Sequence, residues 1–433
     1  MALHTRRDFL RTSVLGASLG WTIPAFLERT FFTLHAQAAD SLTQGITGRD
    51  GPILVVIQLA GGNDGLNTLV PYGHDAYYRA RPRLALGEDR LLKINDELAF
   101  NSRLEPFQDL YDQGLLSILQ GVGYPNPNRS HFRSTEIWQT ASDADRVINQ
   151  GWLGRYFDAA CSGEDPEVGL ALTSTVPQSF HNESGKGLAV SRPESFGWNQ
   201  ASDPSMNEAF EALHHNDDEP MEGFSVADLA STHVESTNNL SFLQRTALDA
   251  QLSSAQIQSL AREGKNEVSY PNGNNLANQL SVVARLISGG LPTRVYYVSQ
   301  GGYDTHNNQA SSHDRLLQQL ATATHAFVND MKSQGNLDRV MVMTFSEFGR
   351  RVAENGNQGT DHGAAAPLFV AGGRVQPGLI GKHPDLEELH RGDLQFSTDF
   401  RSIYATILDQ WLGANSSSIL DQTFPHLPII KPA

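Results

Sequence analysis

The sequence predicts an α/β protein with a mostly parallel central sheet. Three short apolar segments, residues 53–59, 294–299 and 340–345, are rich in β-branched or aromatic residues and each predicts a buried strand. Segments with helical spacing stand at residues 276–287 and 312–331. Alternation of strands with helices favours parallel pairing through right-handed crossovers.

The remaining pattern completes this architecture. Residues 104–112 have helical spacing, and residues 115–119 and 368–371 predict further strands. Between residues 141 and 273 strand signals weaken and polar residues dominate, so we interpret this stretch as an insertion or cap over the sheet. Residues 39–433 are expected to form a single domain.

Composition excludes several classes of function. The formal net charge is −16 and the pI about 5.3, which argues against a nucleic-acid-binding face and against a general affinity for anionic lipid. An anionic substrate remains compatible because a metal ion inverts the local field. Cys161 is the single cysteine, so an intrachain disulfide and a thiolate metal cluster are both excluded. Metal ligands must come from carboxylates, imidazoles, amides or hydroxyls.

The first residues resemble a twin-arginine export signal. Arg6 and Arg7 precede a mostly apolar stretch, residues 9–26, and a small-x-small cleavage site ends at Ala38. Residues 1–38 are therefore expected to engage the twin-arginine translocase and to be removed, which places the mature protein in the periplasm or outside the cell. Three residues make the stretch a poor transmembrane helix: Thr22, Pro24 and Glu28.

Three of the predicted apolar strands end in an acidic residue that follows a Gly or Ser. Asp64 comes after Gly61-Gly62, Asp304 after Gly301-Gly302, and Glu347 after Ser346; His306 and His362 lie in the same loops. Carboxyl ends of parallel strands meet at one edge of a sheet, where α/β proteins bind ligands. These five side chains suit one or two divalent ions, Zn²⁺, Mn²⁺, Mg²⁺ or Ca²⁺. The alternatives are that each acid only caps a local turn, or that the site holds a structural calcium ion.

A second candidate region surrounds Ser130. A Gly- and Pro-rich loop leads to Ser130, which stands at the predicted start of a helix beside His131. A hydroxyl at a helix N-terminus, with Arg129 and Arg133 nearby, suits the binding of an anion or a serine nucleophile. A simple N-cap serine is the alternative.

Several segments together resemble the domain-of-unknown-function 1501 family: QLAGGNDGLN, NRSHFRSTEIW, GGYDTHNNQ, FSEFGR and TDHGAAAPLFVAGG. This family is similar to the alkaline phosphatase and sulfatase superfamily. The resemblance implies an alkaline-phosphatase-like sandwich with two metal ions. Asp64 and Glu347 are then expected to hold one ion, and Asp304, His306 and His362 the other.

The resemblance also implies a nucleophile. Ser130 corresponds to the superfamily's Ser or Thr, with Ser134 and Thr135 as alternatives. Phe348 stands where the superfamily often has a second metal ligand. Cys161 lacks the Pro and Arg of a sulfatase signature, so a formylglycine is not expected.

The resulting hypothesis is an exported metal-dependent hydrolase of phosphate or sulfate esters, with an anionic ester as its partner. Ser130 would attack, and Arg350, or Arg129 or Arg133, would bind the oxygens of the anion. Arg350 pairing with an acidic neighbour is the alternative for that residue. The second hypothesis is a non-catalytic exported binding or assembly protein that retains this fold.

Overall fold

The computed structural model describes residues 51–161, 166–195 and 254–432. The predicted export signal, residues 1–38, and residues 196–253 of the polar stretch lie outside this part of the chain.

Nine strands of the described residues form one central sheet, in the order β13-β5-β12-β9-β1-β8-β6-β7 with β14 paired to β5. The strands are β1 (Ile53–Ala60), β5 (Leu116–Gly123), β6 (Gly169–Ala171), β7 (Leu188–Ala189), β8 (Val295–Gly301), β9 (Val340–Phe345), β12 (Ala366–Ala371), β13 (Gly378–Ile380) and β14 (Thr398–Asp399). β1 lies between β8 and β9 and pairs in parallel with both. β12 runs antiparallel to β5 and β9, whereas the other strand pairs of this sheet are parallel.

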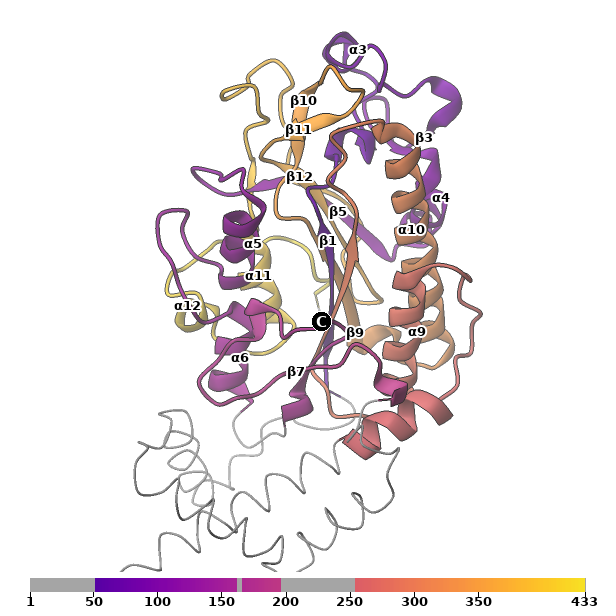
Figure 1. Ribbon diagram of the computed structural model, residues 1–433, viewed down its shortest axis with the longest axis vertical. Coiled ribbons are helices and arrows are strands. Elements are labelled where there is room, and N and C mark those ends of the chain that lie inside the picture. Colours follow the sequence, from indigo (N-terminus) through magenta and orange to yellow (C-terminus); the bar gives the residue numbers. More distant parts are fainter. Residues whose placement is uncertain (1–50, 162–165, 196–253, 433) are drawn as a thin grey trace, which may run out of the picture.

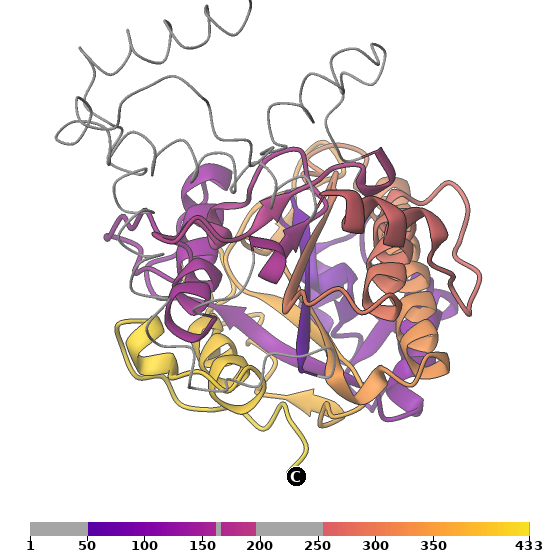
Figure 2. The same ribbon diagram turned by 90° about the horizontal axis from the view of Figure 1, so that it is seen from below.

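Helices cover both faces of the sheet (Figures 1 and 2). One layer holds α4 (Glu105–Asp112), α9 (Asn275–Ser288) and α10 (Gln309–Ser333); the other holds α5 (His131–Thr140), α6 (Trp152–Ala160), α11 (Phe400–Gln410) and α12 (Ser416–Ile419). Successive strand residues face opposite sides, so β1 supplies both cores. Val55 and Ile57 join the core under α9 and α10, and Leu54 and Val56 join the core under α11.

Two small sheets stand at the end where β1, β8 and β9 finish (Figure 1). One consists of β2 (Leu69–Val70), β3 (Leu91–Lys93) and β4 (Ala99–Asn101), and the other of β10 (Arg350–Glu354) and β11 (Thr360–His362). The 3-10 helix η1 (Gly65–Asn67) and α3 (Asp75–Ala80) lie in the same region, over a small core of their own. The carboxyl ends of β1, β8 and β9 are therefore surrounded by two small sheets and two short helices.

The predicted fold class is confirmed: a mostly parallel sheet is flanked by helices. Part of the predicted insertion, residues 141–273, is built into this layer structure, because β6 and β7 extend the central sheet and α6 covers it. These strands are only three and two residues long, which is why their sequence signal is weak. None of the helices described has both the length and the apolar character needed to cross a membrane.

Candidate metal centre

The turns after β1 and β8 are packed directly against each other. Ala60 pairs with Gly301 at the ends of the two strands, and Gly61 follows with φ of 121°. A Cβ at Gly61 would collide with the backbone nitrogen of Asp304, so glycine is required for this close approach. The turn fixes Asp304 just beyond the carboxyl edge of the sheet.

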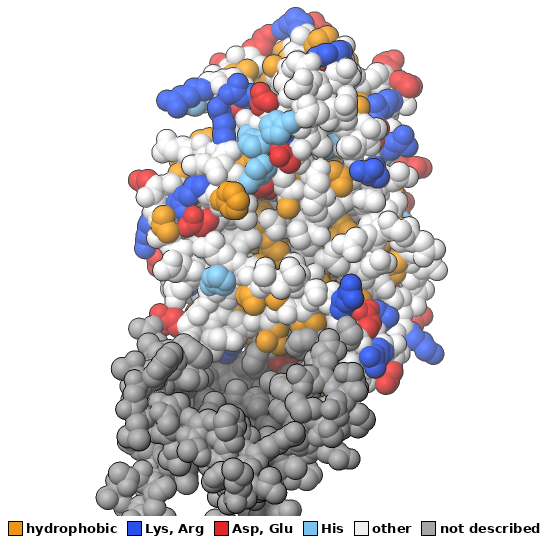
Figure 3. All heavy atoms as spheres, viewed as in Figure 1, with side chains coloured by type: hydrophobic (Ala, Val, Ile, Leu, Met, Phe, Trp, Pro, Cys, Tyr) orange, Lys and Arg blue, Asp and Glu red, His pale blue; other side chains and the backbone are white. Residues whose placement is uncertain are grey.

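Asp304 is the centre of a polar cluster at this edge. Its Oδ1 lies 2.7 Å from Arg350 Nη2, 3.0 Å from His306 Nε2, 3.1 Å from His362 Nε2 and 3.5 Å from His131 Nε2. Burial raises the pKa of Asp304, but hydrogen bonds from Arg350 and His362 and the nearby charges outweigh it and lower this pKa to about 2. The carboxylate is therefore ionised at neutral pH. Histidines gather beside an acidic group on this face of the molecule (Figure 3).

Each of the three imidazoles is held through its other ring nitrogen. Nδ1 of His131 lies 2.7 Å from Glu347 Oε1, Nδ1 of His362 lies 2.8 Å from the Arg129 carbonyl, and Nδ1 of His306 lies 3.3 Å from Asp361 Oδ1. All three rings thus direct Nε2 toward Asp304. Histidines that bind metals are oriented in this way, by a carboxylate or a carbonyl on the far nitrogen.

The residues present fit a metal ion. Nε2 of His131 is buried and has no hydrogen-bond partner among the described residues. The candidate ligand atoms of His131, Asp304 and His362 lie within 4.8 Å of one another, and Nε2 of His306 is 2.9 Å from Nε2 of His362. Imidazoles with a carboxylate suit Zn²⁺ or another transition ion. Calcium prefers an all-oxygen set, so a structural calcium ion fits these residues poorly.

Glu347 reaches the cluster through His131. Its carboxylate is buried, with Oε1 accepting hydrogen bonds from His131 and, at 2.9 Å, from the Gly61 backbone. The contacts described are those of a carboxylate that orients a histidine. Direct ligation by Glu347 stays a prediction.

Asp64 belongs to a separate buried network. Its Oδ2 accepts from Arg81 Nη1 at 2.6 Å and from the Gln309 amide, and both members of the Asp64–Arg81 ion pair have fully buried side chains. Burial raises the pKa of Asp64, but the Arg81 charge and hydrogen bond outweigh it and the net shift is downward. Oδ1 of Asp64 is buried without a partner among the described residues. Metal ligation by Asp64 also stays a prediction.

The guanidinium of Arg350 is buried and fully engaged. It donates to the carbonyls of Gly61, Gly62, Tyr303 and Thr360 and to the Asp304 carboxylate. Pairing with an acidic neighbour, the alternative for this residue, is the contact found. Arg350 thereby holds the β1 and β8 turns together behind Asp304.

Two other predicted anion-binding arginines are also engaged. Arg129 forms an ion pair with Asp393, and Arg133 pairs with Glu136 at 2.8 Å and donates to carbonyls of the following loop. All three predicted arginines therefore contact protein groups in this structure.

Ser130 stands at the rim of the cluster. It is exposed at the N-terminus of α5, its hydroxyl makes no capping bond, and its chain neighbours are Arg129, whose carbonyl holds His362, and His131. Of the two alternatives, Ser134 is buried and bonded to the Tyr124 hydroxyl and the Glu347 carbonyl. Thr135 instead lines an open hollow beside the cluster, together with His131, Asp304 and Glu347 among others.

His131 is the site residue that sequence reasoning did not select as a ligand. The sequence indicates His131 only as a neighbour of a possible anion site. Its place at the start of a helix, one residue after the candidate nucleophile, is the signal that could have identified it.

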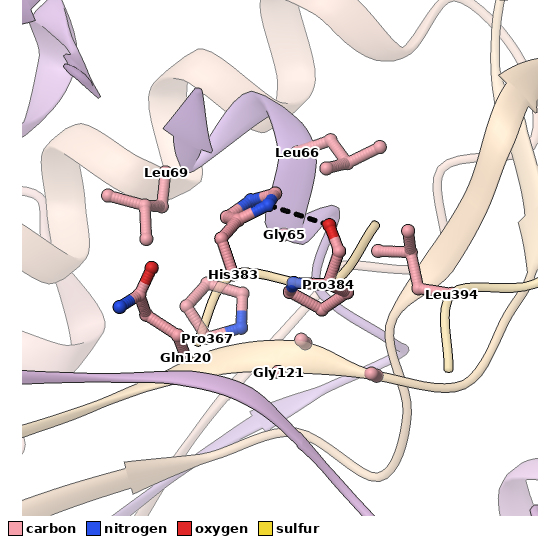
Figure 4. A pocket seen from close by; sticks show the side chains of 11 residues that line it. Gly65, Leu66, Leu69, Gln120, Gly121, Pro367, His383, Pro384 and Leu394 are labelled. Atoms are coloured by element: carbon pink, nitrogen blue, oxygen red, sulfur yellow. Dashed lines mark hydrogen bonds between the residues drawn. The ribbon is translucent and has the colours of Figure 1, made fainter. Parts of the chain in front are cut away.

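A smaller cavity next to η1 offers less chemistry (Figure 4). Its lining is mostly apolar, from Leu66, Leu69 and Leu394, with Gln120 and His383 as the polar side chains. Nδ1 of His383 is 2.9 Å from the Pro384 carbonyl, and burial lowers the pKa of His383 to about 4. No carboxylate lines this cavity, so it is a weaker candidate for a metal centre.

A buried histidine predicts acid sensitivity of the fold. Burial lowers the pKa of His313 to about 4, and its Nε2 lies 2.9 Å from Asn63 Oδ1. The unfolded chain, with a histidine pKa of roughly 6.5, binds the proton more readily, so the free energy of unfolding should fall as pH drops from about 6.5 to about 4. The expected loss from this group is on the order of 3 kcal/mol. Urea unfolding across this range, beside His313→Gln, measures it; equal slopes in both proteins would contradict the assignment.

The fold and the site together define an α/β protein with a histidine–carboxylate cluster at the carboxyl edge of its sheet. The chain belongs to the family described as protein of unknown function (DUF1501), whose model matches residues 118–420. No curated protein matches the sequence.

Similar solved structures are members of the alkaline phosphatase and sulfatase superfamily. The PsFucS1 sulfatase from Pseudoalteromonas sp. is 12% identical, with 93% of this chain and 72% of that chain covered and a TM-score of 0.32. A protein in the alkaline phosphatase superfamily from Vibrio parahaemolyticus is 9% identical, with 82% and 71% covered and a TM-score of 0.33. The phosphonate monoester hydrolase SpPMH from Silicibacter pomeroyi is 8% identical, with 86% and 77% covered and a TM-score of 0.31.

Proposed function

We propose that this protein is an exported metal-dependent hydrolase of phosphate or sulfate esters. The observation that carries the proposal is the convergence of three imidazoles on one ionised carboxylate, with each ring oriented from behind. Such an arrangement concentrates ligand atoms at one point, which a merely structural polar cluster does not require.

His131, Asp304 and His362 would hold the ion, and His306 is placed to join them. A bound divalent ion would supply positive charge that stabilises the transferring anion and lowers the pKa of a nearby hydroxyl. Glu347 keeps His131 in orientation, and Arg350 keeps Asp304 in place and ionised. A second ion would be held by Asp64, whose Oδ1 has no partner among the described residues while Oδ2 contacts Arg81, and by Glu347.

Ser130 is the proposed nucleophile. Its oxygen would form a bond to phosphorus or sulfur as the bond to the ester oxygen breaks, and the proton lost by the hydroxyl would pass to the departing alcohol oxygen. Water would then bond to phosphorus or sulfur as the bond to the Ser130 oxygen breaks, which returns a proton to Ser130 and releases the free anion. The first N–H groups of α5 lack intrahelical acceptors and face the position before the helix, so they favour the negative charge that this reaction develops. These N–H groups would bind the oxygens of the anion in place of Arg129, Arg133 and Arg350, which contact protein groups.

Export and domain organisation form the rest of the proposal. The paired arginines and the cleavage site support transport by the twin-arginine translocase and a periplasmic or secreted product. Residues 39–433 would then be the mature domain, with the polar part of residues 141–273 as an addition to it.

A non-catalytic binding or assembly protein is the second candidate. The observation that favours it is the engagement of Asp64, Arg129, Arg133 and Arg350 by protein groups. A protein that kept the fold and lost turnover would be expected to use such residues for stability.

Metal analysis and turnover separate the two candidates. The mature protein is expected to contain close to one equivalent of a transition ion and to hydrolyse p-nitrophenyl phosphate or p-nitrophenyl sulfate. Dialysis against a chelator should abolish turnover, and adding back Zn²⁺ or Mn²⁺ should restore it. Protein that holds metal but hydrolyses neither ester would favour the binding protein. Turnover that survives complete removal of metal would overturn the proposed mechanism.

A further inference from the structure

An open hollow lies directly beside the histidine cluster. Its lining includes the cluster residues His131 and Asp304, the backbone of Gly301 and Gly302, and the side chain of Phe132. Phe132 follows His131 in the first turn of α5 and is 91% exposed, the most exposed large hydrophobic side chain among the described residues. Single exposed aromatics are common, but this one stands at the entrance to a candidate active site.

The hollow also offers hydrogen-bonding groups. Gln58 and Gln178 line it, and the amide oxygen of Gln58 accepts from the Tyr297 hydroxyl at 2.9 Å. The Tyr297 hydroxyl engages the amide oxygen of Gln58, so the amide nitrogen is the donor that Gln58 offers to the lining of the hollow. The surface next to the cluster thus combines an apolar ring with an amide donor.

We infer that Phe132 binds the organic group of the substrate and selects a ring with one apolar face. This inference rests on the proposed function, because the cluster fixes where the anionic end of the ester lies. A ring attached to that end reaches the neighbouring hollow, where its flat face covers Phe132 and polar substituents meet Gln58. Aryl esters and sugar esters share this chemistry, whereas a methyl ester has nothing to place on the aromatic ring.

Direct binding tests the inference without requiring turnover. Titration calorimetry would compare methylphosphonate, phenylphosphonate and a pyranosyl phosphonate, each added to the metal-loaded mature protein. The wild type is expected to bind at least one of the two ring compounds about 5- to 10-fold more tightly than methylphosphonate. The preferred ring then identifies aryl or sugar esters as the natural class.

Variants of Phe132 test whether its side chain causes the preference for ring compounds over methylphosphonate. Phe132→Ala should reduce the ring preference to within about 2-fold while the affinity for methylphosphonate is unchanged, and Phe132→Leu should fall between them. Val147→Ala is the matched control, because Val147 is another exposed hydrophobic residue, 70% exposed, outside the lining of the hollow. Equal preference in wild type and Phe132→Ala would overturn the inference and leave the anion site standing. Absence of binding by all three phosphonates and by their sulfonate counterparts would instead overturn the proposed function.

Discussion

Replacing Asp304 with Asn is expected to abolish metal binding and to reduce ester hydrolysis by on the order of 100-fold or more, since even residues that only orient a ligand contribute roughly 10- to 100-fold. The substitution keeps the size of the side chain and removes the charge toward which His131, His306 and His362 point. Elemental analysis and kcat/KM measure the two effects. The side chain of Asp304 is 48% exposed, so the variant is expected to fold.

Two matched controls make this result specific. Asp361→Asn alters an exposed carboxylate that touches the cluster through the far nitrogen of His306 and also accepts from the Asn355 amide, so a loss below about 10-fold is expected. Asp109→Asn removes the partner of His325 on a surface outside the cluster and should leave metal content and rate unchanged. An Asp304→Asn protein that retains its metal and its rate would end the proposal of a metal centre at this edge of the sheet.

Replacing Asp64 with Ala is expected to destabilise the fold by about 3–5 kcal/mol, because Arg81 would remain as a buried charge without its carboxylate. Both side chains are fully buried, and the pKa of Asp64 is lowered by its contact with Arg81. The free energy of unfolding in urea measures this loss. The double variant Asp64→Ala with Arg81→Met should recover much of the stability, because no buried charge remains.

Metal content distinguishes this structural role from ligation. If Asp64 serves the Arg81 pair alone, the folded fraction of Asp64→Ala should bind metal with the stoichiometry of the wild type. Loss of one metal equivalent at unchanged stability would instead identify Asp64 as the ligand that the sequence resemblance predicts. Metal content and the free energy of unfolding are measured separately, so together they show whether Asp64 binds metal or only pairs with Arg81.

The sequence by itself determined the layers of the fold and the edge at which to look for a site. Strand 340–345 and the helices around residues 276–287 and 312–331 followed from periodicity, because a buried strand and an amphipathic helix impose local patterns. Asp304, His306 and His362 could be grouped because parallel strands bring their carboxyl ends together.

Only the tertiary structure decided what each side chain contacts. Glu347 orients His131, Asp64 is buried against Arg81, and Arg350 donates to backbone carbonyls. Each of these contacts joins residues that lie in different segments of the chain. An ion pair or a second hydrogen bond on an imidazole leaves no periodic signal, because it depends on how separate loops pack and not on the spacing within one of them.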